Sequence, residues 1–406
     1  MTAVRCRLQA GRTATAPSGR VANASGIAKS ATPRAKGSRV TAREERIAAE
    51  ARALGFPLAG CAPLAPLPVG EFLARWIADG RAGDMTWLAR RSDERLDPRR
   101  LVPWARSVIC LAFPYAPPPP PPGDWRTTLR GRIAAYARGA DYHDRIGDLL
   151  RRLADRLAVL WPGSRFRAYV DTGPVLEREW AMRAGLGWIG KHTVVLHRAL
   201  GSYFFLAELF TDLALDAVPL PADHCGGCTR CTAACPTGAL GPAYTMDPRR
   251  CLAYLTIEHR GAIPVALRPA LENWVFGCDL CQEACPWNRD ARDDADCEAL
   301  SPHLPSLLAL DGDAFRARYG RTAVARAKRR GLLRNVAVAL GNSGNPAAVP
   351  PLIGALADSE PLVRAHAAWA LGRLSGVAAR RALDAARTRE PDPAAAAEIA
   401  EARAGM

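Results

Sequence analysis

The chain has 406 residues, of which 49% are hydrophobic and 23% charged, so it is long enough for two or three domains that each bury a core. No uninterrupted apolar run reaches membrane-spanning length, and we therefore predict a soluble protein with no membrane segment. The formal net charge of +15 indicates a polyanionic partner such as nucleic acid.

Residues 1–42 form the first distinct segment, because they contain no Asp or Glu and too little apolar sequence for a core. An Arg- and Ser-rich segment of this kind could be an organelle transit peptide. No amphipathic periodicity accompanies its charge, which favours a disordered basic leader or a start codon assigned too early.

Helices and strands alternate between residues 43 and 220. Amphipathic helices are predicted over 43–54 and 71–79, and a buried strand over 107–113. After the proline run 117–122, the pattern predicts a strand over 131–137 and a long helix ending at Leu160. The remaining elements are a strand at 167–170, a helix at 175–184 and β segments at 193–196 and 202–210. This alternation predicts an α/β domain over 43–220.

Asp171 is the most chemically suggestive residue of this domain. It follows the predicted strand 167–170 and precedes Thr-Gly-Pro and a helix, the position at which α/β folds place ligand-facing groups. Asp171 or Thr172 could instead cap that helix, and the sequence supports capping and chemistry equally. Nearby, 185–190 matches G-x-G-x-x-G, but it follows a helix and so is not a dinucleotide fingerprint.

Eight of the twelve cysteines lie between His224 and Asn288. The run from Cys225 to Pro236 is a complete C-x2-C-x2-C-x3-C-P pattern, which is typical of bacterial ferredoxins. A second run, from Cys278 to Pro286, has Val275 in place of its first cysteine, and Cys251 is free to fill that gap.

In a ferredoxin arrangement the cysteine before each proline binds the other cluster. Cluster set 1 is then Cys225, Cys228, Cys231 and Cys285, and cluster set 2 is Cys235, Cys251, Cys278 and Cys281. Zinc is the alternative, but a zinc ribbon needs two separate pairs, so two 4Fe-4S clusters are favoured over 221–297. His224 is interpreted as a loop residue rather than a ligand.

Residues 298–406 combine a basic segment with a repeat. Cations crowd the region 315–334 with almost no acid between them, which favours phosphate contacts over an ordinary solvated helix face. The segments 334–341 and 364–372 are near copies, with a helix at 350–356 between them, and this cadence is typical of HEAT-like helical pairs. Two copies are few for a free solenoid, so we expect this module to pack on the rest of the chain.

Two cubane clusters carry single electrons and need an acceptor, which implies a reductase with a second redox centre or a directly reduced substrate. Several motifs then resemble epoxyqueuosine reductase from about Arg43 through the helical tail. The motifs are Asp97-Pro-Arg, Asp141-Tyr-His, 170–178, 185–191, 254–259 and 277–288, together with the isolated Cys251.

The resemblance implies an enzyme with a cobalamin-binding α/β domain, a ferredoxin-like two-cluster domain and a HEAT-like helical module. Its reaction would be the reduction of epoxyqueuosine to queuosine at wobble position 34 of tRNA, the last step of queuosine biosynthesis. Cob(I)alamin would reduce the epoxide, and Asp171, with a raised pKa, would donate a proton to the departing oxygen. The protein would be cytoplasmic and monomeric, would bind a tRNA with a GUN anticodon, and would receive electrons from an external flavodoxin, ferredoxin or similar donor.

Family positions also give candidate contacts. The corrin would be lined by Arg95, Ala134, Asp171, His192, Val195, Leu206, Ala253 and Asp279. Arg178 would approach the substrate nucleotide, and the tRNA backbone would be bound by Arg316, Arg318, Arg321, Lys328, Arg329, Arg330 and Arg334.

Two rival functions are compatible with part of these features. A corrinoid iron-sulfur reductase of a small molecule, of the reductive dehalogenase type, explains the clusters but not the basic segment and tail. A nucleic-acid-binding ferredoxin without catalysis explains those features but not the turn at Asp171.

Overall fold

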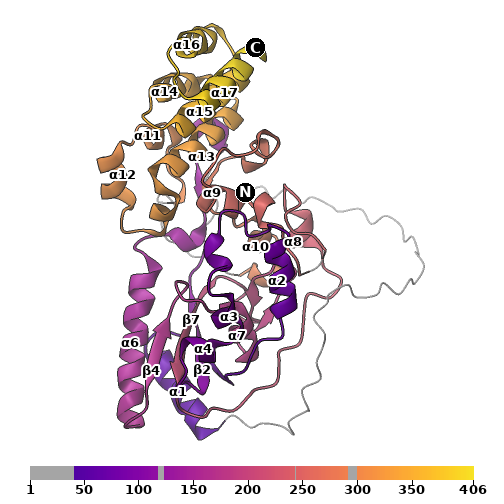
Figure 1. Ribbon diagram of the computed structural model, residues 1–406, viewed down its shortest axis with the longest axis vertical. Helices are drawn as coiled ribbons and strands as arrows, with labels where there is room; N and C mark the ends of the chain where they lie inside the picture. The colour runs from indigo at the N-terminus through magenta and orange to yellow at the C-terminus, as the bar shows by residue number, and fades with distance from the viewer. Residues whose placement is uncertain (1–40, 118–122, 243, 291–299) are drawn as a thin grey trace, which may run out of the picture.

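The computed structural model describes residues 41–117, 123–242, 244–290 and 300–406 (Figure 1). The predictions for most of the basic leader and for the proline run therefore lie outside the described residues. Across the described ranges, no helix is both long enough and apolar enough to cross a membrane.

A four-stranded sheet organises the N-terminal half. Its strand order is β1 (Leu58–Pro63), β2 (Ser107–Pro114), β7 (Phe204–Thr211) and β4 (Phe166–Tyr169), and every neighbouring pair is antiparallel. The strand predicted at 107–113 is thus a central strand, and its first six residues are buried. The mixed α/β class is confirmed, although the pairing differs from the parallel sheets in which strand ends gather at one edge.

Helices cover both faces of this sheet. On one face, α1 (Ala42–Ala53) and α6 (Tyr142–Leu160) share a core with Ile109 and Leu111 of β2. On the other face, α7 (Glu177–Arg183) packs against Val108 and Cys110. Successive β2 side chains therefore enter opposite cores, as the two-residue period of a strand requires. The shorter helices of this half are α2 (Gly70–Ala78), α3 (Ser92–Leu96), α4 (Pro98–Leu101) and α5 (Trp125–Thr128).

Two short strands depart from the sequence prediction. Only β3 (Arg132–Ile133) of the expected strand 131–137 is extended, and it pairs in parallel with β8 (Trp274–Phe276) outside the main sheet. This pairing joins the α/β half to the cysteine-rich segment. The glycine-rich stretch 185–190 leads into a two-stranded hairpin, in which β5 (Trp188–Ile189) pairs with β6 (Val195–Leu196).

In the described part of the cysteine-rich segment the α-helices are short, and they are α8 (Arg230–Ala233), α9 (Leu252–Ile257) and α10 (Leu280–Glu283). The tail beyond it is helical, as predicted, with α11 (Leu304–Leu308), α12 (Gly312–Tyr319), α13 (Lys328–Ser343), α14 (Val349–Ala355), α15 (Pro361–Leu374), α16 (Val377–Arg387) and α17 (Pro393–Ala404). Figure 1 shows this tail stacked at one end of the molecule, away from the sheet.

The tail is not an independent body. One buried cluster of apolar side chains runs from Ile133 and Leu255 through Phe276 into Leu333 and Leu371. Gly341 of α13 lies so close to α15 that an added Cβ would stand 2.8 Å from the Cα of Ala370. The expectation that the helical repeats pack on the rest of the chain is therefore confirmed.

Candidate active site

The four thiols of cluster set 1 line one partly open cavity of about 50 Å³. Cys225, Cys228 and Cys231 come from the first cysteine run, whereas Cys285 comes from the second. The cavity is completed by Lys191, His192, Leu196, His224, Pro286 and Trp287. Residues some 60 positions apart in the chain thus converge as the ferredoxin pattern predicts.

The thiols of cluster set 2 affect one another's pKa. Burial raises the pKa of the Cys278 and Cys281 thiols, and the charge of Cys251 raises both further. The charge of Cys235 raises the pKa of both Cys251 and Cys281, so each of these four thiols interacts electrostatically with another of the set. All ten described cysteines are free thiols.

The spacing within these groups bears on the kind of metal site. In the described ranges, no three His, Cys, Asp or Glu side chains lie close enough to share one metal ion. A zinc ribbon would gather four ligands on a single ion, whereas a 4Fe-4S cluster is held by thiolates spread around its outside. Two sets of four cysteines supply the ligand number of two 4Fe-4S clusters, and the assignment of each set stays a prediction.

Asp171 occupies a strained turn directly after β4. Its backbone has φ +52°, a left-handed conformation that is uncommon for a residue other than glycine. The helix α7 begins six residues later with Leu176 as its N-cap and no side-chain cap, so the capping interpretation of Asp171 is wrong. Its side chain is 47% exposed and is free for other contacts.

The first turn of α6 holds the Asp171 carboxylate. Tyr142 donates its hydroxyl proton to Oδ2 at 2.9 Å, and Nε2 of His143 lies 3.3 Å from the same oxygen. Asp141, the N-cap of α6, accepts the backbone N–H of His143 at 3.0 Å and contacts its Nδ1 at 2.6 Å. A helix cap therefore orients the histidine that faces Asp171.

The pKa of Asp171 shifts in the direction opposite to our prediction. Burial raises this pKa, but hydrogen bonds from His143 and Tyr142 and the charges of His143 and Arg326 outweigh burial and lower it. The hydrogen bond with Asp171 raises the pKa of His143 in turn. In the structure described, the proton of this pair therefore resides preferentially on His143.

The predicted corrin contacts come from several elements, and the charge of Asp171 acts on one of them, Arg95. Arg95 is buried on α3, and its guanidinium lies 5.2 Å from the ring centre of Trp87. Burial lowers the pKa of Arg95, and the charge of Asp171 acts in the opposite direction. Asp279 is buried and accepts the backbone N–H of Ala135 at 2.7 Å. Tyr136 follows Ala135 in the sequence. Burial raises the pKa of Tyr136, and the charges of Asp171 and Asp279 raise it further. Ala134, His192 and Val195 are buried, and Leu206 and Ala253 are partly exposed.

Two orphaned atoms test whether these residues suit a cofactor rich in amide groups, such as cobalamin. Nε2 of His192 and Nε of Arg95 are both buried and have no hydrogen-bond partner among the described residues. Burial lowers the pKa of His192 to about 4, so this imidazole is neutral. Burial also raises the pKa of Asp279 to about 7. Buried polar groups without partners are uncommon, and a polar ligand would satisfy them.

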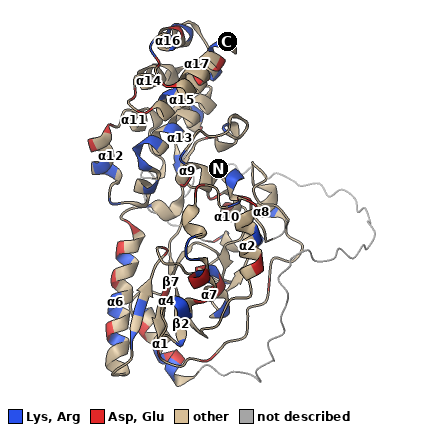
Figure 2. Cartoon of the chain, viewed as in Figure 1, with Lys and Arg blue, Asp and Glu red and all other residues tan. Residues whose placement is uncertain are grey.

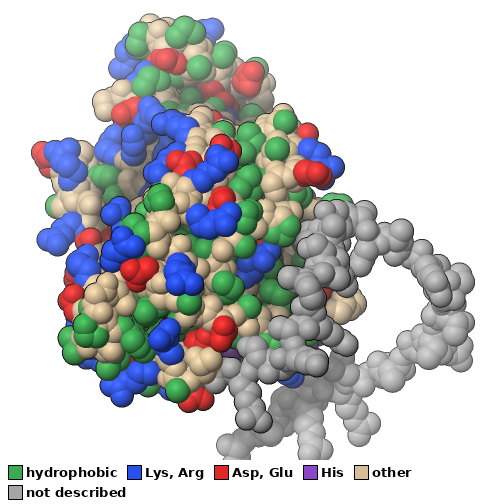
Figure 3. All heavy atoms as spheres, turned by 60° about the horizontal axis from the view of Figure 1, so that its bottom comes forward, with side chains coloured by type: hydrophobic (Ala, Val, Ile, Leu, Met, Phe, Trp, Pro, Cys, Tyr) green, Lys and Arg blue, Asp and Glu red, His purple; other side chains and the backbone are tan. Residues whose placement is uncertain are grey.

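The basic segment places most of its predicted contacts in solvent. Arg316 and Arg318 on α12, together with Arg321, Lys328 and Arg330, are exposed. Figure 2 shows Lys and Arg in blue on the helices of the tail, and in Figure 3 Lys and Arg side chains gather where the tail meets the rest of the molecule. These five side chains remain candidates for phosphate contacts.

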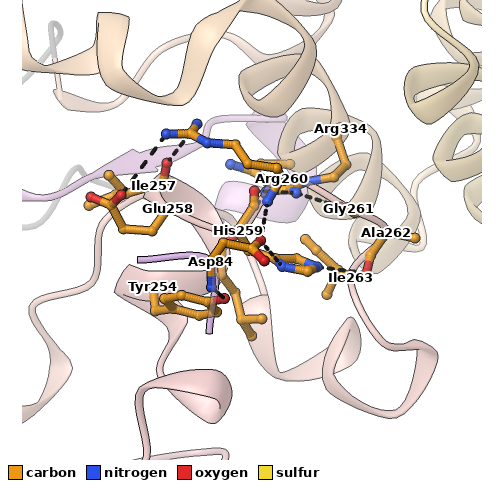
Figure 4. A network of polar contacts seen from close by, with 12 residues as sticks. Asp84, Tyr254, Ile257, Glu258, His259, Arg260, Gly261, Ala262, Ile263 and Arg334 are labelled. Atoms are coloured by element: carbon orange, nitrogen blue, oxygen red, sulfur yellow. Dashed lines mark hydrogen bonds and ion pairs between the residues drawn. The ribbon is translucent and has the colours of Figure 1, made fainter. Parts of the chain in front are cut away.

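Two other predicted contacts are wrong. Arg334 is completely buried and donates to the carbonyl oxygens of Leu255, His259 and Gly261 at 2.5, 2.9 and 2.7 Å. Figure 4 shows its guanidinium directed into the loop that follows α9. Arg329 is bound on two nitrogens by the carboxylate of Asp358. Both side chains are used within the protein and cannot reach a phosphate.

The loop in Figure 4 also receives contacts from the N-terminal half. Oδ2 of Asp84 lies 2.9 Å from Nδ1 of His259 and accepts the backbone N–H of Arg260 at 2.8 Å. Arg326 forms an ion pair with Glu258, and its charge reaches Asp171. The charge of one cation of the basic segment therefore acts on the Asp171 carboxylate.

Comparisons with known proteins agree with this geometry. The family model described as "Epoxyqueuosine reductase QueG, DUF1730" matches residues 95–172, a 4Fe-4S double cluster binding domain matches 224–288, and HEAT repeats match 322–403. The epoxyqueuosine reductase of Pseudomonas aeruginosa is 41% identical over 341 residues, which cover 79% of this chain and 92% of that protein. The chain belongs to the epoxyqueuosine reductase family.

Two further epoxyqueuosine reductases extend the comparison. The protein from Escherichia coli is 38% identical over 317 residues, covering 74% of this chain and 81% of that protein. A crystal structure of an epoxyqueuosine reductase with an epoxyqueuosine-modified tRNA stem loop has a TM-score of 0.84 and 29% identity, covering 89% of this chain and 98% of that one. The predicted combination of an α/β half, a double-cluster segment and HEAT-like helices is confirmed.

Several residues at this family site had no role in the sequence prediction. Tyr142 and His143 belong to a quoted motif, but only the structure places them on Asp171. Glu177 accepts the backbone N–H of Asp171 at 2.6 Å. Glu208 is a lone carboxylate in the apolar strand 204–211, and that contrast was the one signal that could have identified it.

Proposed function

We propose that this chain reduces epoxyqueuosine to queuosine at wobble position 34 of tRNA, with cobalamin and two 4Fe-4S clusters as cofactors. The observation that carries the proposal is the Asp171 carboxylate, held by Tyr142 and His143 on a strained turn at 2.9 and 3.3 Å. Support also comes from the solved relative that holds an epoxyqueuosine-modified tRNA stem loop.

The reaction removes the epoxide oxygen as water, and it consumes two electrons and two protons. Asp171 delivers a proton to the departing oxygen. Because the pKa of His143 is raised and that of Asp171 is lowered, the proton rests on His143, and Asp171 takes it up only as it passes a proton to the departing oxygen. A solved epoxyqueuosine reductase from Bacillus subtilis, 28% identical, has its catalytic loop swung out of the active site, which supports a loop at this position that changes conformation during the reaction.

Cobalamin, when bound, supplies the strongly reducing, nucleophilic centre that the epoxide requires. Arg95, His192 and Asp279 would hold it through their buried polar atoms, and Ala134, Val195, Leu206 and Ala253 would lie against its apolar surfaces. Asp171 would face both the corrin and the substrate. Exclusion of water by this buried lining would protect the reduced cofactor.

Electrons would enter from an external flavodoxin, ferredoxin or similar donor and pass through the two clusters. Cluster set 1 would hold one 4Fe-4S cluster and cluster set 2 the other. Residues 43–220 would form the cobalamin domain, 221–297 the cluster domain and 298–406 the tRNA-binding module. We place the protein in the cytoplasm as a monomer.

Contacts with tRNA would be of two kinds. Arg178 on α7 donates to the carbonyl oxygen of Thr193, and we expect it to approach the substrate nucleotide. Arg316, Arg318, Arg321, Lys328 and Arg330 would contact phosphates and orient the anticodon stem. Phosphate contacts of this kind fix position without reading base sequence.

A substrate comparison tests this function against the small-molecule alternative. The loaded protein would be offered tRNA carrying epoxyqueuosine, the free epoxyqueuosine nucleoside and a halogenated phenol under the same reducing conditions. We expect rapid reduction of the tRNA, with a rate that falls as salt is raised because phosphate contacts release counterions. Equal rates for tRNA and free nucleoside, or turnover of the phenol alone, would contradict the proposal.

A further inference from the structure

Glu208 is a buried carboxyl group that the proposed reaction does not use. It lies in the middle of β7, between Cys110 on β2 and Tyr169 on β4, and it is 0% exposed. Neither of its oxygens has a hydrogen-bond donor among the described residues. An ionised carboxylate in such a place is costly, so Glu208 is held in its protonated form.

Glu177 is the group that can accept this proton. Burial and the charge of Asp171 raise the pKa of Glu177 to about 7, whereas burial and the charge of Glu177 raise the pKa of Glu208 well above its usual range. A hydrogen bond with Glu208 lowers the pKa of Glu177 and raises that of Glu208, which is the response of a pair in which Glu208 carries the proton and Glu177 accepts it. Two carboxyl groups this close cannot both ionise without strong repulsion.

The pair is connected to the Asp171 turn through the backbone. Oε1 of Glu177 accepts the N–H of Asp171 at 2.6 Å, at the residue whose φ is +52°. A backbone conformation of this kind persists only where surrounding contacts hold it. Glu177 therefore contacts the strained residue on one side and Glu208 on the other.

We propose that Glu177 and Glu208 share one proton, and that this singly charged pair is the positioning device that holds Asp171 for proton transfer. The inference rests on the proposed function, because its catalytic consequence is seen in epoxide reduction. Glu177 and Glu208 are positioning residues, since neither contacts the reacting atoms.

Other charged groups face the pair and set its response to pH. Arg178 on α7 and Arg95 on α3 favour the charged form of Glu177, whereas Asp171 opposes it. Burial raises the pKa of Tyr142 on α6 and of Cys110 on β2, and the charges of these carboxylates raise both pKa values further. Loss of the shared proton at rising pH leaves three carboxylates together, so Glu177 moves away from Glu208 and the Asp171 turn is released.

A glutamine at position 208 separates charge from positioning. Glu208→Gln gives Glu177 a permanent N–H donor and cannot lose a proton, so we expect near-normal turnover at neutral pH and no decline at higher pH. Glu177→Ala removes the acceptor for the Asp171 N–H, and we expect at least a tenfold loss of turnover with both clusters retained. Glu71→Gln, at an exposed carboxylate on α2, is the matched control and should follow the wild-type pH profile.

The experiment combines two measurements. Single-turnover rates are recorded from pH 6 to 9 for the loaded proteins, and infrared spectra are recorded on cofactor-free protein with ¹³C-labelled glutamate carboxyl groups, which separates Glu208 from Asp279. We expect a protonated-glutamate band at pH 7 that disappears in Glu208→Gln. If that variant does not fold, Glu177→Gln serves instead, because it removes the shared proton's acceptor and should shift the same band.

Absence of the band in wild type, or an unchanged decline at high pH in Glu208→Gln, would overturn the inference. A wild-type protein that shows the band but reduces no epoxide would leave the shared proton in place and refute the proposed function. The two failures are therefore distinguishable.

Discussion

Replacing Asp171 with asparagine removes the carboxylate that relays the proton while it preserves the shape of the site. The amide oxygen of Asp171→Asn can still accept the hydroxyl proton of Tyr142, so the 2.9 Å contact and the turn should survive. General acid catalysis contributes about 100-fold to 10,000-fold to a rate, and we expect a loss of that size in the single-turnover rate. Cluster and cobalamin content should match wild type.

Asp171→Ala should be as inactive, and it should also leave Tyr142 and His143 without their shared partner. Because the Asp171 side chain is 47% exposed, water can replace it, and we expect a stability change of less than about 1 kcal/mol. Asp144→Asn, at an exposed residue on the same helix as His143, is the matched control and should keep full activity. Retention of more than about a third of the wild-type rate by Asp171→Asn would refute the proton-donor role.

Three other predictions concern the clusters, the tail and the histidine. Cys251→Ala should lose about half of the iron, because it removes one of four ligands from cluster set 2; an unchanged iron content would disprove the assignment. Arg334→Met should lower the free energy of unfolding by about 3–5 kcal/mol, since three buried carbonyl oxygens lose their donor. Arg330→Met should change stability by less than about 0.5 kcal/mol yet weaken tRNA binding, and similar denaturation midpoints for the two variants would contradict this contrast. The raised pKa of His143 contributes stability below its usual pKa of 6.5, and that stability is lost as pH rises through the higher folded value. His143→Gln should abolish this part of the pH dependence in chemical denaturation, and an unaltered profile would count against it.

Local patterns in the sequence predicted the elements well. The cysteine spacing, the buried strand 107–113 and the long helix ending at Leu160 all follow from signals carried by neighbouring residues. The pairing of β3 with β8 could not be predicted, because it joins segments more than 140 residues apart through only two residues of strand.

The site was predicted less completely for a related reason. Asp171 was found from its place after a strand, but the direction of its pKa shift depends on His143 and Arg326, which arrive from distant elements. Arg334 was assigned to tRNA because it belongs to a run of cations. From Gly331 onward nearly every residue of the helix α13 is buried. Its sequence therefore lacks the division into a polar and an apolar face from which the burial of Arg334 could have been predicted.

The central claim is the removal of one oxygen atom from a tRNA nucleoside with cobalamin as cofactor. We would measure it in a single turnover with anaerobically reconstituted protein, cobalamin and tRNA carrying epoxyqueuosine, and would identify the nucleoside by mass spectrometry. The account predicts a product lighter by one oxygen, formed only when cobalamin is present. An unchanged nucleoside, with both clusters and the corrin shown to be loaded, would contradict it.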